Sequence, residues 1–261
     1  MTDDDYTIDL FCRVDDKMRD VPKHSQANLY PSEIVTLALL FALKGVGNRA
    51  FYRWLNRNFR HLFPQLPERT RLFRLFKTHQ DWSERFLAEP GLLAVADSYG
   101  IELIHPIREG RSLAQMGKKG LSNHRWIVGG KLGFVVNHLG QIVAWDCAAA
   151  NVHDSVFQPL IARLQDQTVV LTDHGFHAHL GDPPNMMVCH RGAWNVRMVV
   201  ETVLSMLTVV CHFKKVGHRV WDYFRARLAF TMAVFNILTA WHGLQPDENG
   251  YVRLSIAEFS L

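Results

Sequence analysis

Two aspartates and one glutamate in this chain have the type and the spacing needed to hold a divalent cation. Asp97 and Asp173 each follow a short apolar run, and Glu201 lies in a helix-like stretch downstream. Apolar runs rich in Val and Leu are typical of buried central strands. The sheet fixes the backbone of an acid at the end of such a strand, and the acid's side chain enters the crevice beside the strand end. The pattern therefore predicts an oxygen-lined site for Mg²⁺ or Mn²⁺.

This set of acids predicts phosphoryl transfer. Divalent ions held by carboxylates activate a bound water and stabilise the leaving oxygen when a phosphodiester bond is cut. The plain alternative is that the two aspartates are solvated strand ends or helix caps and that the glutamate is a surface residue. The matching place of two acids after apolar runs favours the site. Val200 and Val203 favour it too, since they predict a buried helix face beside Glu201.

The first ninety residues are predicted to be helical. One helix is expected to start with Ser32 as its N-cap and to end at Gly45, and two more are expected at residues 49–58 and 69–77. Arginines alternate with aromatic residues across 49–77. This pattern has two interpretations, an amphipathic bundle with a solvated basic face or a helical module that binds DNA phosphates. The neighbouring phosphoryl-transfer site favours DNA.

From residue 91 the pattern changes to strands. Strands are predicted at 92–96, 169–172 and 186–189, a β-hairpin at 131–137 and 142–147 with its turn at Gly140, and helices at 154–164, 196–212 and 221–241. This order is that of an RNase H-like domain, whose mixed sheet brings its first and fourth strands side by side. The predicted fold class is α/β, with an N-terminal all-helical module at 1–90, an RNase H-like mixed-sheet catalytic domain at 91–245 and a tail at 246–261.

The composition permits a nucleic-acid partner without requiring one. With 261 residues, 48% of them hydrophobic, the chain can bury a full core, and its net charge of +4 is mildly basic. Its four cysteines are scattered, as is typical of free thiols in a reducing compartment. The opening is acidic, unlike that of a signal peptide, and the longest apolar run is too short to span a bilayer. A cytoplasmic protein is expected.

The acids and their neighbours resemble those of the DDE transposases of bacterial insertion sequences. Asp97 stands in Ala-Asp-Ser, and Asp173 stands in Thr-Asp-His-Gly-Phe. Glu201 follows Trp194 and Arg197 in the order aromatic, two residues, Arg, three residues, Glu, which marks the third acid in a large group of these enzymes. The resemblance extends from about residue 30 to residue 241.

This resemblance implies a transposase that uses Mg²⁺ or Mn²⁺ held by Asp97, Asp173 and Glu201. Its implied partners are DNA, both the terminal inverted repeats of the element and the target, and a second copy of the chain, because two element ends must be joined. Trp194 and Arg197 are implied DNA contacts. A guanidinium stays protonated, so the arginine is expected to clamp a phosphate or carboxylate rather than to act as an acid or base.

Two positions depart from the family pattern. The lysine expected seven residues after the glutamate is Thr208, and the residue after the second acid, which is often basic, is His174. Lys214 and Lys215 follow closely, but neither has the helical phase of the missing lysine. Both departures concern side chains that contact DNA rather than the predicted metal ligands.

Five further residues have both a structural and a functional interpretation. Lys118 and Lys119 in a short basic turn, and Lys131 at the start of the hairpin, are either solvated or in contact with DNA. His153 and Asp154 follow the hairpin, where they either cap a helix or form a second layer around the acids.

Two other functions stay open on sequence grounds. One is an inactive or domesticated relative that binds DNA without cutting it, which the intact set of acids disfavours. The other is an RNase H-like nuclease, which the Trp194, Arg197 and Glu201 pattern disfavours.

Overall fold

A computed structural model describes residues 2–112, 115–122, 125–189, 197–214, 217–244, 248 and 254–259. The helices are α1 (Asp3–Met18), α2 (Pro31–Lys44), α3 (Asn48–Asn58), α4 (Arg69–Thr78), α5 (Gln158–Ala162), α6 (Arg197–Val209) and α7 (Trp221–His242). The strands are β1 (Leu93–Ile104), β2 (Lys118–Ser122), β3 (Arg125–Asn137), β4 (Ile142–Ala149), β5 (Val169–Thr172) and β6 (Met186–Val188). Short 3₁₀ helices are η1 (Gln80–Phe86), η2 (Pro106–Arg108), η3 (Asp154–Phe157), η4 (His174–Phe176) and η5 (Ala257–Phe259).

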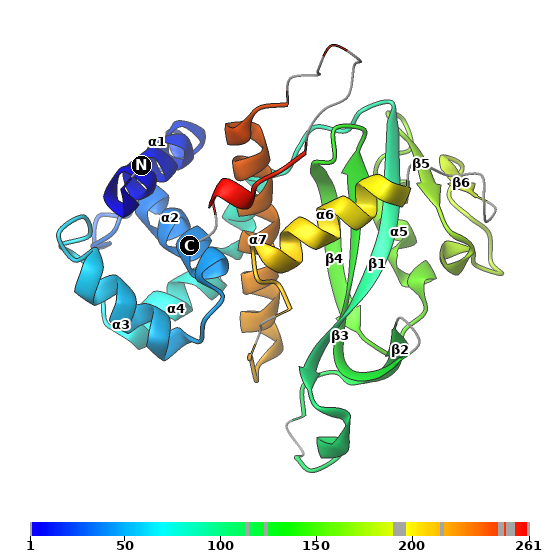
Figure 1. The fold of residues 1–261 in the computed structure, drawn as a ribbon, viewed down its shortest axis with the longest axis horizontal. Coiled ribbons are helices and arrows are strands. Elements are labelled where there is room, and N and C mark those ends of the chain that lie inside the picture. The colour runs from blue at the N-terminus through cyan, green and yellow to red at the C-terminus, as the bar shows by residue number, and fades with distance from the viewer. Residues whose placement is uncertain are drawn as a thin grey trace.

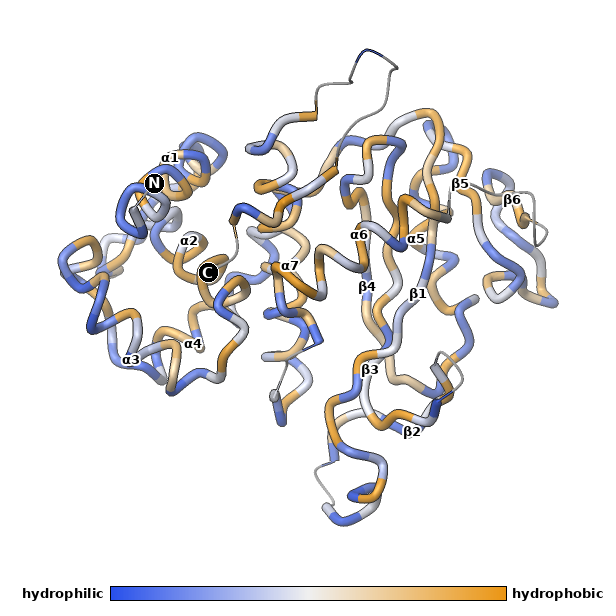
Figure 2. The backbone as a smooth tube through the Cα atoms, in the orientation of Figure 1, coloured by the Kyte–Doolittle hydropathy of each residue, from blue (hydrophilic) through white to orange (hydrophobic). Residues whose placement is uncertain are grey.

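The N-terminal helices form one side of the molecule and the sheet forms the other, with α7 between them (Figure 1). Helix α2 packs against α1 and α7 and is more hydrophobic than α1 and α3 (Figure 2). The predicted helical character of the first ninety residues is therefore confirmed.

The start of α2 differs from its prediction by two residues. Ser32 is not the N-cap, because the helix begins at Pro31 and Tyr30 takes the cap position. Proline is well suited to a first helical position, since its φ is already helical and its missing N–H needs no partner there. The Glu33 carboxylate accepts a hydrogen bond from the Tyr30 N–H at 2.6 Å. Gly45 ends the helix as predicted, with a left-handed φ of 62°.

Helix α7 joins the helical part to the sheet. Most of its residues are buried, and it belongs to one hydrophobic core that also contains residues of α1, α2, α6 and β3. Asn236 lies inside this core, where its amide donates to the carbonyls of Phe86 and Ile142 at 3.0 and 2.7 Å and accepts from the Ile142 N–H at 2.8 Å. These bonds fix α7 against η1 and the start of β4. The domain boundary predicted at residue 90 stays a prediction.

The C-terminal segment 254–259 packs back onto the helical part. Tyr6 of α1 stacks on Trp241 of α7 with ring centroids 5.4 Å apart, and Phe259 lies against both rings. Among the described residues, no single helix is long and apolar enough to cross a membrane; α2 and α3 together meet that test by length and composition, but they meet at 117°.

The sheet has the mixed topology that was predicted. Within the described residues its order is β2-β3-β1-β5-β6, and β4 also pairs with β3. Strand β1 is antiparallel to β3 and parallel to β5, so the first and fourth predicted strands do lie side by side. Helix α6 crosses one face of the sheet, while η3 and α5 cover the other (Figure 1).

Three predicted elements need correction. Strand β1 continues to Ile104, so Asp97 lies within the strand rather than at its end, because β3 is also longer than predicted and pairs along this extension. Residues 118–120, predicted as a basic turn, belong to β2, which pairs with the added part of β3. The helix predicted at 154–164 is η3 followed by α5, with Pro159 in the first turn of α5.

Candidate active site

The three predicted acids line one cleft of about 530 Å³ at the carboxyl end of β5. Asp97 enters it from β1, Asp173 from the residue after β5, and Glu201 from α6. The three acids thus share one cleft, and their role as cation ligands stays a prediction.

The register of the two parallel strands brings the aspartates together. Val95 of β1 lies beside Leu171 of β5. Two residues further along, the chain reaches Asp97 in one strand and Asp173 just after the other. Because β5 ends at Thr172 while β1 continues, the cleft opens where β1 loses its neighbour.

Glu201 comes from the helix that covers this face of the sheet. Val200 and Val203 on α6 are buried in the main core, and Glu201 between them is exposed. The predicted buried face beside this acid is therefore confirmed. Burial of Val200 and Val203 sets the orientation of α6, so that Glu201 lines the cleft.

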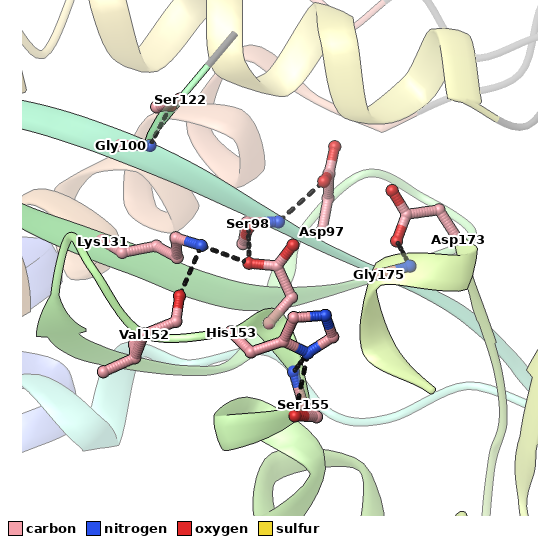
Figure 3. A network of polar contacts seen from close by, with 11 residues as sticks. Asp97, Ser98, Gly100, Ser122, Lys131, Val152, His153, Ser155, Asp173 and Gly175 are labelled. Atoms are coloured by element: carbon pink, nitrogen blue, oxygen red, sulfur yellow. Dashed lines mark hydrogen bonds and ion pairs between the residues drawn. The ribbon is translucent and has the colours of Figure 1, made fainter. Parts of the chain in front are cut away.

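Each aspartate is held by a backbone N–H close by in the chain. An Asp97 carboxylate oxygen accepts from the Ser98 N–H at 2.7 Å. An Asp173 carboxylate oxygen accepts from the Gly175 N–H at 2.9 Å, which makes Asp173 the N-cap of η4 (Figure 3). Both hydrogen bonds restrict the orientation of the two carboxylates that line the cleft.

The loop after η4 is tied to α5 through Asp182. Its carboxylate pairs with His177 at 2.7 Å and accepts hydrogen bonds from the Ala178 N–H at 3.0 Å and the Gln158 amide at 2.8 Å. The His177 contact, followed by the Ala178 bond, holds the pKa of Asp182 below its usual value. These contacts fix the loop that follows Asp173.

A fourth acid, Asp154, lies at the same cleft. One of its oxygens accepts hydrogen bonds from the Ser98 hydroxyl at 2.6 Å and from the Lys131 ammonium at 2.8 Å (Figure 3). The Lys131 ammonium also donates to the Val152 carbonyl at 2.8 Å. Asp154 and Lys131 both line the cleft.

The other predicted site residues are not among those that line the cleft, or they lie outside the described residues. Lys118 and Lys119 are exposed on β2, and the Lys119 ammonium lies 3.4 Å from Glu109. His153 caps η3, accepting from the Ser155 N–H at 3.4 Å. Arg197 begins α6, but its side chain and the whole of Trp194 lie outside the described residues.

Lys214 and Ser98 are cleft residues that the sequence did not assign. From the sequence, Lys214 lacks the helical phase of the lysine that the family pattern expects after Glu201. Helix α6 ends at Val209, however, so helical phase does not decide where the Lys214 side chain lies. Its ammonium lies 4.3 Å from the centre of the Tyr99 ring, and it lines the cleft with the three acids. Ser98 follows an acid directly, yet a single sequence carries no indication that its hydroxyl binds Asp154.

The cleft fits a divalent cation in the kind of ligand that it offers. Its acids supply only carboxylate oxygens, the ligands that Mg²⁺ and Mn²⁺ prefer. In position, no group of three or more His, Cys, Asp or Glu side chains within the described part of the chain stands close enough to hold one ion. The acids share the cleft without converging on a point.

Comparison with known proteins supports a DDE transposase. Residues 88–181 match a family model described as the transposase DDE domain. The matched segment runs from the entry to β1 through η4, so it includes Asp97, Asp154 and Asp173 and ends before Glu201. No curated protein and no solved structure matches the chain.

Proposed function

We propose that this protein is a DNA transposase of the kind encoded by bacterial insertion sequences, which cuts DNA at the ends of its element and joins those ends to target DNA. The observation that carries the proposal is the parallel register of β1 and β5. It sets Asp97 beside Asp173 in one cleft, inside the segment that matches the transposase DDE domain. The order of strands in the mixed sheet supports an RNase H-like fold.

Asp97, Asp173 and Glu201 are the proposed ligands of Mg²⁺ or Mn²⁺. When bound, the cation would lower the pKa of a water molecule and neutralise charge on the phosphate. The water oxygen bonds to phosphorus, the bond from phosphorus to the 3′ oxygen breaks, and that oxygen leaves as a 3′ hydroxyl. In the second reaction this hydroxyl attacks a target phosphate and releases a target 3′ hydroxyl, so the number of phosphodiester bonds is kept. No covalent protein–DNA bond is required.

Exposed basic side chains provide the proposed path for DNA. Arg49, Arg53 and Arg57 are exposed on α3 at four-residue spacing, which places them on one face of the helix. Lys118 and Lys119 are exposed on β2 next to the cleft-lining residues of that strand, and Arg197 and Trp194 remain proposed contacts. Such side chains bind phosphates without reading sequence.

The remaining proposals concern assembly and place. Joining two element ends calls for two catalytic clefts, so a homodimer on DNA is proposed, in the bacterial cytosol where the chromosome lies. His153 and Asp154 are proposed as a second layer around the acids, Asp154 through its hydrogen bond with Ser98 and His153 by capping the short helix that begins with Asp154.

The test is cleavage of a labelled duplex that carries the terminal repeat flanking the coding sequence, with Mg²⁺ or Mn²⁺. We expect a metal-dependent break at the repeat boundary that Asp97→Asn loses and that Asp166→Asn, a change at an exposed turn between α5 and β5, keeps. Binding without cleavage by the unchanged protein would point instead to an inactive DNA-binding relative. If the unchanged protein neither binds nor cuts the duplex, both the transposase and the inactive DNA-binding relative are contradicted.

A further inference from the structure

Lys131 and Asp154, which both line the cleft, form an ion pair that is mostly buried. Their side chains are 11% and 24% exposed, and the ammonium lies 2.8 Å from the carboxylate. A buried charge is costly unless it is paired and hydrogen-bonded. This pair meets that condition, because the ammonium also binds the Val152 carbonyl and the carboxylate also binds the Ser98 hydroxyl.

The pair lies on the opposite face of β1 from Asp97. Side chains alternate between the faces of a strand, so Asp97 and Ser98 point to opposite sides. Cross-strand partners share a face, and Lys131 pairs with Gly100, two residues after Ser98. Lys131 and Ser98 therefore lie on the same face of the sheet, the one covered by η3 and α5, and both bind Asp154 there.

Gly133 explains how Asp154 comes to this place. Gly133 lies directly opposite Ser98 in the sheet. A Cβ at Gly133 would lie 2.3 Å from the ring of Phe157, so only glycine leaves room for that ring against β3. Phe157 is buried there, and Asp154 stands three residues earlier in the same short helix. The packing of η3 against β3 thus places Asp154 within hydrogen-bonding distance of Ser98.

Asp154 also lies close to the turn that holds Asp173. A Cβ built on Gly175 would lie 2.9 Å from the second carboxylate oxygen of Asp154 and 3.0 Å from an oxygen of Asp173. The two carboxylates therefore lie on the same side of Gly175, in the space that the side chain of a larger residue would need. Asp154 thus binds Ser98, next to Asp97, and lies beside Gly175, two residues after Asp173.

We propose that Lys131 and Asp154 are positioning residues that fix the separation of Asp97 and Asp173, and that Lys131 is not a DNA contact. Asp154 ties the Asp97 strand to the Asp173 turn, and Lys131 holds the Asp154 carboxylate in place. The Lys131 ammonium has two protein oxygens as partners and is nearly enclosed, whereas a lysine that binds phosphate presents its ammonium to solvent. The proposal rests on the proposed cation site of the same cleft.

The first experiment measures Mn²⁺ affinity of the full-length protein without DNA, by electron paramagnetic resonance. We expect Asp154→Ala and Lys131→Met each to weaken binding about tenfold, the usual size of effect for groups that orient metal ligands. The matched control is Glu102→Ala, which breaks the 2.9 Å pair between Glu102 of β1 and Arg125 of β3, where the arginine is 68% exposed. It is expected to leave the affinity unchanged.

A double variant separates positioning from simple stability. Asp154→Leu with Lys131→Met removes both charges together, so no buried charge is left without its partner, and the urea midpoint is expected to return toward that of the unchanged protein. The Mn²⁺ affinity should stay about tenfold weaker. An affinity restored together with stability would overturn the proposal. So would an Asp154→Ala protein that loses binding as fully as Asp97→Ala, since Asp154 would then be a ligand itself.

A second experiment tests Lys131 against DNA. The logarithm of duplex affinity is plotted against the logarithm of salt concentration, where each lost phosphate contact lowers the slope by about 0.9. Lys131→Met should keep the slope of the unchanged protein, and Lys214→Met, which removes an exposed ammonium from the cleft, should lower it. A lower slope for Lys131→Met would contradict the inference.

The two proposals fail in different ways. If the Mn²⁺ results hold but no duplex is bound or cut, the proposed function fails alone. If repeats are cut but the variants bind Mn²⁺ normally, the positioning role fails alone. If the unchanged protein binds no Mn²⁺, hydrogen exchange at residues 173–177 decides: faster exchange in Asp154→Ala than in Glu102→Ala supports the positioning role, and equal exchange overturns it.

Discussion

At the scale of single residues, burial decides which charged and titratable groups are structural. Arg227 is 3% exposed, caps the end of α2 through the carbonyls of Ala42 and Val46, and lies 4.2 Å over the ring of Phe41. Burial lowers its pKa to about 10. The same environment affects His218, whose pKa falls to about 4, first through burial and then through the charge of Arg227.

His218 should make the protein sensitive to acid. Its folded pKa of about 4 lies below the ordinary 6.5, so the unfolded chain binds the proton more tightly. The stability that neutral His218 contributes is present above pH 6.5 and is lost as the pH falls toward 4, by up to about 3 kcal/mol. We expect His218→Gln to lose less stability than the unchanged protein when urea unfolding is compared at pH 7 and pH 5. His24→Gln, at an exposed position, should behave as the unchanged protein does.

At the scale of elements, two strands and one helix position the site, and they were not equally predictable. The short runs that end near Asp97 and Asp173 are apolar enough to indicate central strands, and the structure has strands there. Strand β2 was mistaken for a turn, because Lys-Lys-Gly is polar and its strand conformation comes from pairing with β3. A local sequence pattern identifies a strand that has an apolar face, but it misses a polar segment that becomes a strand by pairing with a partner distant in the sequence.

The contacts of the candidate site were likewise predictable only in part. The neighbourhood of the two aspartates follows from strand order, which the sequence indicates. The contact of Ser98 with Asp154 joins residues 56 positions apart and depends on the missing side chain of Gly133, which lets Phe157 dock. No local pattern encodes such a contact, so the sequence leaves both interpretations of Lys131 open.

Asn236 should be the most sensitive polar residue of α7. Asn236→Ala would leave the Phe86 carbonyl and both backbone groups of Ile142 without these side-chain partners inside the core. We expect a loss of about 2–4 kcal/mol in the free energy of unfolding, since each buried group left unpaired costs about 1–3 kcal/mol. Urea denaturation measures this loss. Asn56→Ala on the exposed side of α3 serves as the control and should change stability by less than about 0.5 kcal/mol.

At the scale of the whole molecule, the helical part and the sheet meet through α7 and share one core. The basic face of α3 and the acidic cleft therefore belong to a connected body rather than to loosely tethered parts. We propose that the basic face of α3 binds DNA phosphates and that the acidic cleft holds the phosphodiester bond that is cut.

The arginines of α3 should carry much of the salt dependence of DNA binding. Changing Arg49, Arg53 and Arg57 to Gln should lower the slope of log affinity against log salt by roughly 2–3. The control changes Lys17, Arg19 and Lys23 to Gln, which removes the same charge from exposed positions in and after α1. An equal fall in slope for both triple variants would show that net charge, rather than the α3 face, determines binding.

The most direct measurement of the central claim is strand transfer. A labelled duplex that ends in the terminal repeat with a free 3′ hydroxyl is incubated with a supercoiled plasmid, Mg²⁺ and either the unchanged protein or Asp173→Asn. We expect the unchanged protein to join the label covalently to the plasmid and the variant to join none. Nicked plasmid without joined label would contradict transposition and identify a nuclease.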